Sequence, residues 1–296
     1  MSSPSEDVDV ALLRRWGLPD PGDSKKSRGR VMVVGGSLRS PGAVLLAGEA
    51  ALRVGAGRLG LVVPDTIDGQ LGVTLPEAAV FSLPAQASDA LEGSLRDELE
   101  SADAVLLGPG FDDAQETRLT LLSVVGAGVS TLILDAFAIG VLPDVSREDL
   151  PRRLILNLNL EEAEILLEHG LSSHRHRDLI DIAQRYDAVV HCYGIIAAPD
   201  GATWTVRAGG AGLGTSGSGD VLAGAITGFA ARGMEPHRAA VWGSWAHARA
   251  GDRLTASVGI GFLARDIPAE LTLAVKEVHA SEPDHRPRFD PAAHSF

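Results

Sequence analysis

The sequence predicts an α/β protein in which a mostly parallel sheet lies between two layers of helices. Strand-like apolar runs alternate with helical patterns, and these runs cover residues 30–36, 58–64, 78–83, 104–110, 131–136, 153–158 and 187–193. The runs are continuously apolar, as is typical of parallel strands that are buried on both faces. Residues 195–208 differ, because Pro199-Asp200-Gly201 predicts a turn between two strands, and we expect a hairpin at the sheet edge there.

The chain reads as one domain with a segment at each end. No internal repeat or linker interrupts residues 29–280, which we assign to a single domain. Residues 1–28 form a polar N-terminal segment with a short amphipathic piece at 11–16. Residues 281–296 contain Pro, His, Asp and Arg and are expected to form a disordered tail. The last part of the domain is predicted to be helical over residues 217–232, 236–254 and 261–276.

Composition limits the partners of the chain. The formal net charge of −13 argues against nucleic acid and anionic membranes, although backbone amides can still bind a small anion. The single cysteine, Cys192, excludes an internal disulfide and favours a reducing cytoplasm. No apolar run reaches the length of a membrane span, and the first residues do not resemble a signal peptide. We therefore expect a cytoplasmic protein.

A literal G-x-G-x-x-G occurs at Gly55-Ala-Gly57-Arg-Leu-Gly60. A dinucleotide-binding turn needs a strand before these glycines and a helix after them. Here the order is reversed, because residues 43–54 have helical spacing and residues 58–64 form an apolar run that ends at a proline. Gly55 is therefore expected to end a helix in the left-handed conformation, and the phosphate site must lie elsewhere.

The segment from Gly209 to Gly233 is the better candidate for a phosphate site. A loop of small residues is followed by Asp220 and then by an apolar pattern with helical period. The amides of Gly217, Ser218 and Gly219 would point outward at a helix N-terminus, where the dipole favours an anion. The lysine of a P-loop is absent. Asp220 has two readings that the pattern leaves open: a helix cap, or a base that accepts the proton of an attacking hydroxyl group.

Nine stretches, in order, resemble the ADP-dependent NAD(P)H-hydrate dehydratases of the ribokinase-like superfamily. They span about 28–269 and cover residues 29–37, 41–64, 75–80, 106–110, 134–138, 196–201, 215–228, 247–254 and 261–267. The resemblance implies a ribokinase-like three-layer sandwich and a carbon–oxygen lyase that repairs hydrated NADH or NADPH. In that reaction ADP (or ATP) phosphorylates the hydroxyl group of the hydrate, and phosphate then leaves. Magnesium would travel with the nucleotide rather than in a protein metal site, and a homo-oligomer is implied.

The resemblance also carries over site residues. Asp220 would be the catalytic base. The positions that would bind the nucleotide and its phosphates are Thr215, Gly217, Ser218 and Gly219. The positions that would line the substrate site are Gly42, Ala43, Gly110, Asn159 and Asp220.

The chain departs from the family pattern around this site. Asn159 stands where the family has a histidine, and Asn159-x-x-Glu162 is similar to a motif of sugar and vitamin kinases in the superfamily. The family's Lys-Gly is replaced within residues 189–194, and Phe137 replaces an aspartate. Two rival functions therefore stay open: a small-molecule kinase of the same fold, and a degenerate member that only binds nucleotide.

Other polar residues carry weaker signals. His174 and His176 are expected to open a solvated helix rather than to bind a metal. Cys192 is expected to be a buried structural thiol on a strand, with His191 on the opposite face. His247 is expected to be a packing histidine near Trp242 and Trp245.

Overall fold

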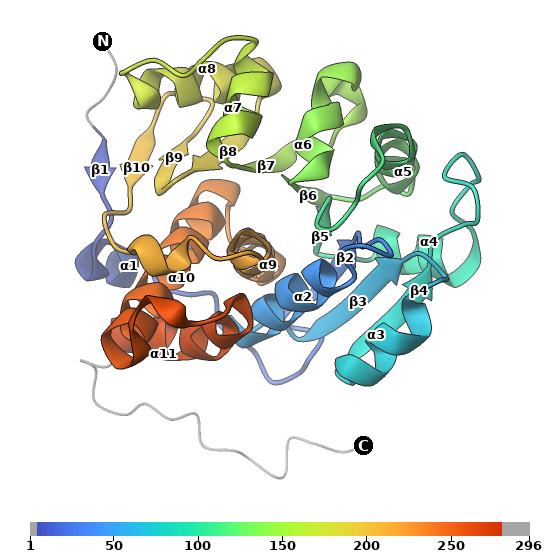
Figure 1. Ribbon diagram of the computed structural model, residues 1–296, viewed down its shortest axis with the longest axis horizontal. Coiled ribbons are helices and arrows are strands. Elements are labelled where there is room, and N and C mark those ends of the chain that lie inside the picture. Colours follow the sequence, from blue (N-terminus) through green and yellow to red (C-terminus); the bar gives the residue numbers. More distant parts are fainter. Residues whose placement is uncertain (1–4, 280–296) are drawn as a thin grey trace.

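The computed structural model describes residues 5–279, and its centre is a ten-stranded sheet (Figure 1). The strands are β1 (Glu6–Asp7), β2 (Arg30–Val34), β3 (Arg58–Val63), β4 (Ala78–Ser82), β5 (Ala104–Leu107), β6 (Thr131–Asp135), β7 (Arg153–Leu158), β8 (Val189–Cys192), β9 (Ile195–Ala197) and β10 (Thr203–Thr205). Their order across the sheet is β1-β10-β9-β8-β7-β6-β5-β2-β3-β4. Only β9 runs antiparallel to its neighbours among these strands. The predicted mostly parallel sheet is confirmed.

Helices cover both faces of the sheet. They are α1 (Val10–Trp16), α2 (Gly42–Arg53), α3 (Asp68–Thr74), α4 (Gly93–Glu100), α5 (Ala114–Gly126), α6 (Phe137–Val141), α7 (Leu160–Leu167), α8 (Arg175–Tyr186), α9 (Ser218–Ala231), α10 (Pro236–Val258) and α11 (Ile267–His279). Figure 1 shows α9, α10 and α11 on one side of the sheet and α5 to α8 on the other. The three-layer arrangement expected from the continuously apolar strands is therefore present.

Strands β2 to β9 contribute side chains to two separate hydrophobic cores. Along β2, Val31 and Val33 belong to the core beneath α2, α9 and α10, whereas Met32 and Val34 belong to the core beneath α5 to α8. Successive side chains of a strand point to opposite faces, so a strand between two helical layers must be apolar at every position. This is the physical origin of the uninterrupted apolar runs in the sequence.

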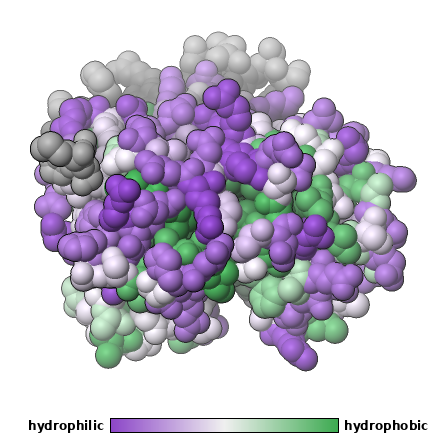
Figure 2. Space-filling view, turned by 90° about the horizontal axis from the view of Figure 1, so that it is seen from above, coloured by the Kyte–Doolittle hydropathy of each residue, from purple (hydrophilic) through white to green (hydrophobic). Residues whose placement is uncertain are grey.

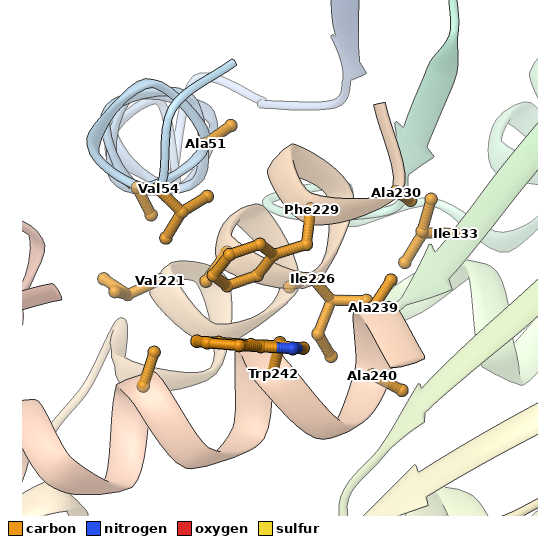
Figure 3. Packing of buried hydrophobic residues seen from close by; sticks show 14 of the residues in the cluster. Ala51, Val54, Ile133, Val221, Ile226, Phe229, Ala230, Ala239, Ala240 and Trp242 are labelled. Carbon is orange, nitrogen blue, oxygen red and sulfur yellow. The ribbon is translucent and has the colours of Figure 1, made fainter. Parts of the chain in front are cut away.

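The core beneath α9 and α10 contains the largest buried aromatic side chains. Phe229 of α9 and Trp242 of α10 are both fully buried, with ring centroids 5.6 Å apart (Figure 3). Figure 3 also shows Ile226 beside them, with Ala51 of α2 and Val54, the residue that follows α2, on the far side of Phe229. The packing fixes α9 between α2 and α10, and thereby fixes where the N-terminus of α9 lies.

The N-terminal segment takes part in the fold. Strand β1 pairs with β10 in parallel, and Leu12 and Leu13 of α1 are buried. Trp16 lies edge-on to Trp204 of β10, with ring centroids 6.0 Å apart. The predicted hairpin is therefore β9–β10, with β1 outside it at the edge. The expected tail at residues 281–296 lies outside the described residues.

The G-x-G-x-x-G stretch is a helix-to-strand turn, as predicted. Helix α2 ends at Arg53, and β3 begins at Arg58. Gly55 has a φ of 108°, a conformation that favours glycine. The stretch therefore has a structural role and offers no helix N-terminus to a phosphate.

The outer surface seen from above is mainly hydrophilic, with hydrophobic residues visible in the hollows between polar side chains (Figure 2). No helix among residues 5–279 is long and apolar enough to cross a membrane. Polar groups lie at the carboxyl ends of the parallel strands, which is where ligands bind in open α/β sheets.

Candidate active site

Helix α9 begins at a glycine that no other residue can replace without strain. Gly217 is the N-cap residue, with a φ of 89°. A methyl group added there would lie 2.6 Å from Leu46 Cδ1 and 3.1 Å from Ala264 Cβ. A glycine has no side chain to cap the helix, and no other side chain among residues 5–279 caps it. The helix N-terminus therefore keeps its free donors and its positive dipole end for another partner.

One amide of this turn is hydrogen-bonded within the protein, and the others are open. The Ser218 amide donates to the Thr215 carbonyl at 3.2 Å, which differs from the expectation that it points outward. That bond closes the turn. The amides of Gly217, Gly219 and Asp220 have no acceptor among the described residues. A methyl group added at Gly219 would meet no atom within 4 Å. The open amides therefore adjoin free space, as an anion site requires.

Asp220 does not cap the helix. It is the third residue of α9, and its carboxylate makes no hydrogen bond or ion pair with any residue between 5 and 279. The side chain is partly buried, and burial raises the pKa of Asp220 to about 6. An unpaired carboxylate that is partly withdrawn from water is suited to act as a general base. Of the two readings of Asp220, the geometry favours the base.

Three of the predicted substrate positions lie beside one another. Gly42 and Ala43 form the start of α2, and a methyl group at Gly110 would lie 3.0 Å from Ala43 Cβ. Gly42 faces open space, with no atom within 4 Å of an added methyl group. Leu46, one turn along α2, packs against Gly217. The start of α2 is therefore next to the start of α9, and the two predicted groups of residues adjoin.

Asn159 has a structural role. Its Oδ1 accepts from the Glu162 amide at 2.8 Å, while Glu162 Oε2 accepts from the Asn159 amide at 2.9 Å, so the pair forms a capping box for α7. The capping box accounts for the Asn159-x-x-Glu162 pattern at the start of α7. Burial is the main cause that raises the pKa of Glu162 to about 7.

A row of buried polar residues crosses three neighbouring strands near their carboxyl ends. Asp135 of β6 pairs in register with Asn157 of β7, which pairs with His191 of β8. Asn157 Nδ2 donates to Asp135 Oδ1 at 2.7 Å, and Asn157 Oδ1 lies 2.8 Å from His191 Nδ1. Ser244 of α10 reaches His191 Nε2 at 3.1 Å. Through Ser244, the row connects α10 to the carboxyl ends of the central strands, beside Asp220.

His247 does more than pack. It is buried, and its Nε2 lies 3.0 Å from the hydroxyl group of Ser218, the first residue of α9. Burial lowers the pKa of His247 to about 4, so the ring is neutral and can hold Ser218 without adding charge.

The prediction of a buried Cys192 is confirmed, and burial raises the pKa of its thiol to about 12.

The sequence reasoning missed the polar row, although a signal was present. At or one residue before their carboxyl ends, the strands contain Leu-Ile-Leu-Asp135, Leu-Ile-Leu-Asn157 and Val-Val-His191. A polar residue at the same place in three consecutive buried strands is unusual, because burying an unpaired polar group costs free energy. Parallel pairing brings such residues into one row, so the repeat itself predicts a hydrogen-bonded set.

Residues 5–279 contain no cluster of three or more His, Cys, Asp or Glu side chains that could hold a metal ion.

Comparison with known proteins gives first the class of the fold. The Arabidopsis thaliana ribokinase structure, complexed with ribose and ATP, covers 84% of this chain and 98% of its own with a TM-score of 0.58 at 12% identity. The fold is therefore ribokinase-like. The Bacillus subtilis ADP/ATP-dependent NAD(P)H-hydrate dehydratase, co-crystallised with ATP/Mg²⁺, has a TM-score of 0.79 at 26% identity, with 93% and 99% of the two chains covered.

Sequence comparison identifies the family. A family model described as NAD(P)H-hydrate dehydratase matches residues 31–273. The ADP-dependent (S)-NAD(P)H-hydrate dehydratase of Xanthomonas campestris pv. campestris is 40% identical over 274 residues, which cover 89% of this chain and 94% of that enzyme. This chain belongs to the NAD(P)H-hydrate dehydratase family. It spans about half of the bifunctional repair enzyme Nnr of Escherichia coli, with 32% identity and 49% of that protein covered.

Proposed function

We propose that the protein dehydrates hydrated NADH or NADPH, with ADP or ATP as phosphoryl donor. The observation that carries this proposal is the start of α9, where free amides of Gly217 and Gly219 adjoin the unpaired carboxylate of Asp220. A phosphoryl-transfer site needs donors for the phosphate and a base for the attacking hydroxyl group. Family membership supports the identity of the substrate.

The proposed chemistry has two steps. Asp220 accepts the proton of the hydrate's hydroxyl group, whose oxygen attacks the terminal phosphorus of the nucleotide while the bond to the leaving phosphate oxygen breaks. The carbon–oxygen bond to the phosphorylated oxygen then breaks, and phosphate departs with the bonding electrons. The neighbouring ring carbon loses a proton to solvent, and the electrons of its C–H bond form the recovered double bond. Phosphorylation is useful because hydroxide is a poor leaving group near neutral pH and phosphate is a good one.

Each predicted residue has a place in this proposal. The amides of Gly217 and Gly219 bind the phosphoryl group, and Thr215 and Ser218 hold the turn through their own hydrogen bond. Gly42, Ala43 and Gly110 line the space for the hydrated nicotinamide, and the lack of side chains at the two glycines lets the ring approach. Asn159 supports the site by capping α7. Magnesium supplies positive charge while bound to the phosphates of the nucleotide.

The proposal also covers the compartment, the oligomeric state and the partners of the enzyme. We place it in the cytoplasm, because a chain with one buried cysteine has no need of an oxidising compartment. We also propose a homo-oligomer, because the family resemblance implies one. The acidic net charge disfavours nucleic acid as a partner.

The test is the recovery of NADH absorbance from hydrated NADH. Folded protein is mixed with the hydrate and Mg²⁺, and ADP and ATP are added in separate reactions, with a nucleotide-free reaction as control. Nucleotide-dependent recovery is expected, and the faster nucleotide identifies the preferred donor. No recovery with either nucleotide would contradict the proposal, and phosphorylation of a small alcohol instead would favour the kinase alternative.

A further inference from the structure

The loops that follow β2 and β5 flank a point where the strand order of the sheet reverses (Figure 1). The chain runs through β2, β3 and β4 toward one edge, and then crosses to β5, β6 and β7 toward the other edge. Ligands of open α/β sheets bind in the crevice between two such diverging loops. Gly36 lies in the loop after β2, and a methyl group added at Gly110, in the loop after β5, would lie 3.1 Å from Gly36 Cα. The predicted substrate position Gly110 therefore lies at this crevice.

A cavity of about 170 Å³ extends from the crevice. Its lining begins with Gly36 after β2 and Phe111 after β5, and continues along the loops after β3 and β4 and along α5. Strand β6, beside Asp220, is three strand spacings from β3, which amounts to about 14 Å. An extended dinucleotide spans such a separation. A dinucleotide with its nicotinamide ring at Asp220 would therefore have its second nucleoside at the cavity.

The wall of the cavity contains a buried hydroxyl group without a partner in the protein. Thr120 of α5 is 6% exposed and lines the cavity. Its hydroxyl group makes no hydrogen bond with any residue between 5 and 279. Within that range, Trp242 Nε1 is the one side-chain polar atom that is fully enclosed and unpaired, so the Thr120 hydroxyl group is open to the cavity. Since buried polar groups are normally hydrogen-bonded, this hydroxyl group is available to a ligand.

The charged side chains that line the cavity are all acidic. Among the described residues of the lining there is no Lys, Arg or His, and the carboxylates belong to Asp65, Asp89, Asp112, Asp113 and Glu116. Asp113 caps α5, and Asp112 lies 3.9 Å from Arg39, whose side chain is 86% exposed. The side chains of Asp65, Asp89 and Glu116 are exposed and have no hydrogen bond or ion pair within residues 5–279. The cavity therefore offers acceptors to hydroxyl groups and repels anions.

We propose that this cavity binds the adenosine ribose of the substrate and selects NADH hydrate over NADPH hydrate. The inference rests on the proposed function and adds the preferred substrate. Carboxylates accept hydrogen bonds from the free 2′- and 3′-hydroxyl groups of NADH hydrate, as they do at other NAD sites. The 2′-phosphate of NADPH hydrate would instead bring negative charge into a cavity that is lined by carboxylates, and like charges there oppose binding.

The first test compares kcat/KM for NADH hydrate and NADPH hydrate, each with ADP and Mg²⁺. NADH hydrate should be preferred about tenfold at low ionic strength, because each carboxylate near the phosphate adds a repulsion of about the size expected in water. The preference should shrink at high salt, since the carboxylates are exposed and salt screens them. Equal values for the two substrates, or a preference for NADPH hydrate, would overturn the proposal.

The second test removes two of the unpaired carboxylates with little change of shape. Asp65→Asn/Glu116→Gln should raise kcat/KM for NADPH hydrate about fivefold, through KM and not through kcat, and leave the value for NADH hydrate within about threefold. Asp149→Asn/Glu148→Gln makes the same two replacements at exposed residues before β7, at the amino ends of the strands, and should change neither value. An unchanged preference in the cavity variant would contradict the assignment to these charges.

Binding without turnover separates this inference from the proposed reaction. NADH and NADPH are titrated into the wild type and the cavity variant, and the fluorescence of the reduced ring reports binding. NADH should bind about tenfold more tightly than NADPH in the wild type, and the difference should narrow in the variant. If it does and no NADH is recovered from the hydrate, the cavity proposal stands and the dehydration reaction fails. Equal affinities, or no binding of either dinucleotide, would overturn the cavity proposal whatever the recovery assay shows.

Discussion

Helices α7 and α9 carry an acidic residue at the same position and use it in opposite ways. Glu162 is the third residue of α7, and it completes a capping box with Asn159. Asp220 is the third residue of α9, where the N-cap is Gly217 and no side chain in the described part of the chain caps the helix. One helix start is satisfied by its own residues, whereas the other leaves amides and a carboxylate free. This difference is the reason for proposing a phosphate site at the start of α9 and not at the start of α7.

The largest difference between the two helices should appear in turnover. Asp220→Asn removes the base, and kcat should fall by about 10²–10⁴-fold while the affinity for ADP changes little. Glu162→Gln keeps the capping box, because glutamine can also accept from the N-cap amide, and should keep most of the activity. The rate of NADH recovery and a binding titration with ADP measure both effects. Equal losses in the two variants would end the functional distinction between the helices.

Substitutions at the two glycines at the start of α9 should affect different properties: stability at Gly217 and ADP binding at Gly219. Gly217→Ala places a methyl group against Leu46 in a conformation that disfavours side chains, and should cost about 1–3 kcal/mol of unfolding free energy. Gly219→Ala meets no protein atom, so its stability should change by less than about 1 kcal/mol. Its methyl group enters the space in front of the free amides, and ADP affinity should fall about tenfold. Denaturant unfolding and ADP titration distinguish the two, and unchanged ADP affinity in Gly219→Ala would show that phosphate binds elsewhere.

The buried carboxyl groups predict how stability depends on pH. The pKa of Asp220 is raised from 3.8 to about 6 by burial, so the folded state binds this proton more tightly than the unfolded state. That contribution is present below about pH 4 and is lost as the pH rises through 6. Asp220→Asn should therefore be more stable than the wild type by about 2 kcal/mol at pH 8, and equally stable at pH 4. Unfolding at the two pH values checks the sign, and a less stable variant at pH 8 would refute it.

The smallest expected effect concerns the cap of α7. Asn159→Ala should cost about 1 kcal/mol of stability and leave the activity of the folded enzyme within a few-fold. Asn159→Asp keeps an acceptor for the Glu162 amide and serves as the control. A large loss of activity in both variants, at a temperature where both are folded, would give Asn159 a direct role in binding substrate.

Much of the fold could be predicted from the sequence because burial on both faces leaves a continuous local signal. The strands between residues 30 and 192 and the turn at Gly55 are of this kind. Strand β1 was missed, since its two residues, Glu6 and Asp7, are polar and are held in the sheet only by distant pairing with β10.

The candidate site likewise has a part that the sequence pattern reveals and a part that it does not. Asp220 and its glycines stand together in the sequence, so their pattern is visible there. The buried polar row of Asp135, Asn157 and His191 is spread over three strands. Its members come together only when the strands pair in the observed register. Local pattern could not show that the Ser218 amide turns inward, because this depends on the hydrogen bond that closes the turn.

We propose that the open start of α9 binds the nucleotide phosphates, and an ADP titration followed by backbone amide NMR is the direct test. The amide signals of Gly217, Gly219 and Asp220 should shift most in the full chain with Mg²⁺ present, while those of Asn159 and Glu162 at the capped start of α7 should shift much less. Saturating shifts at α7, or at neither helix, would show that the phosphates do not bind at the start of α9.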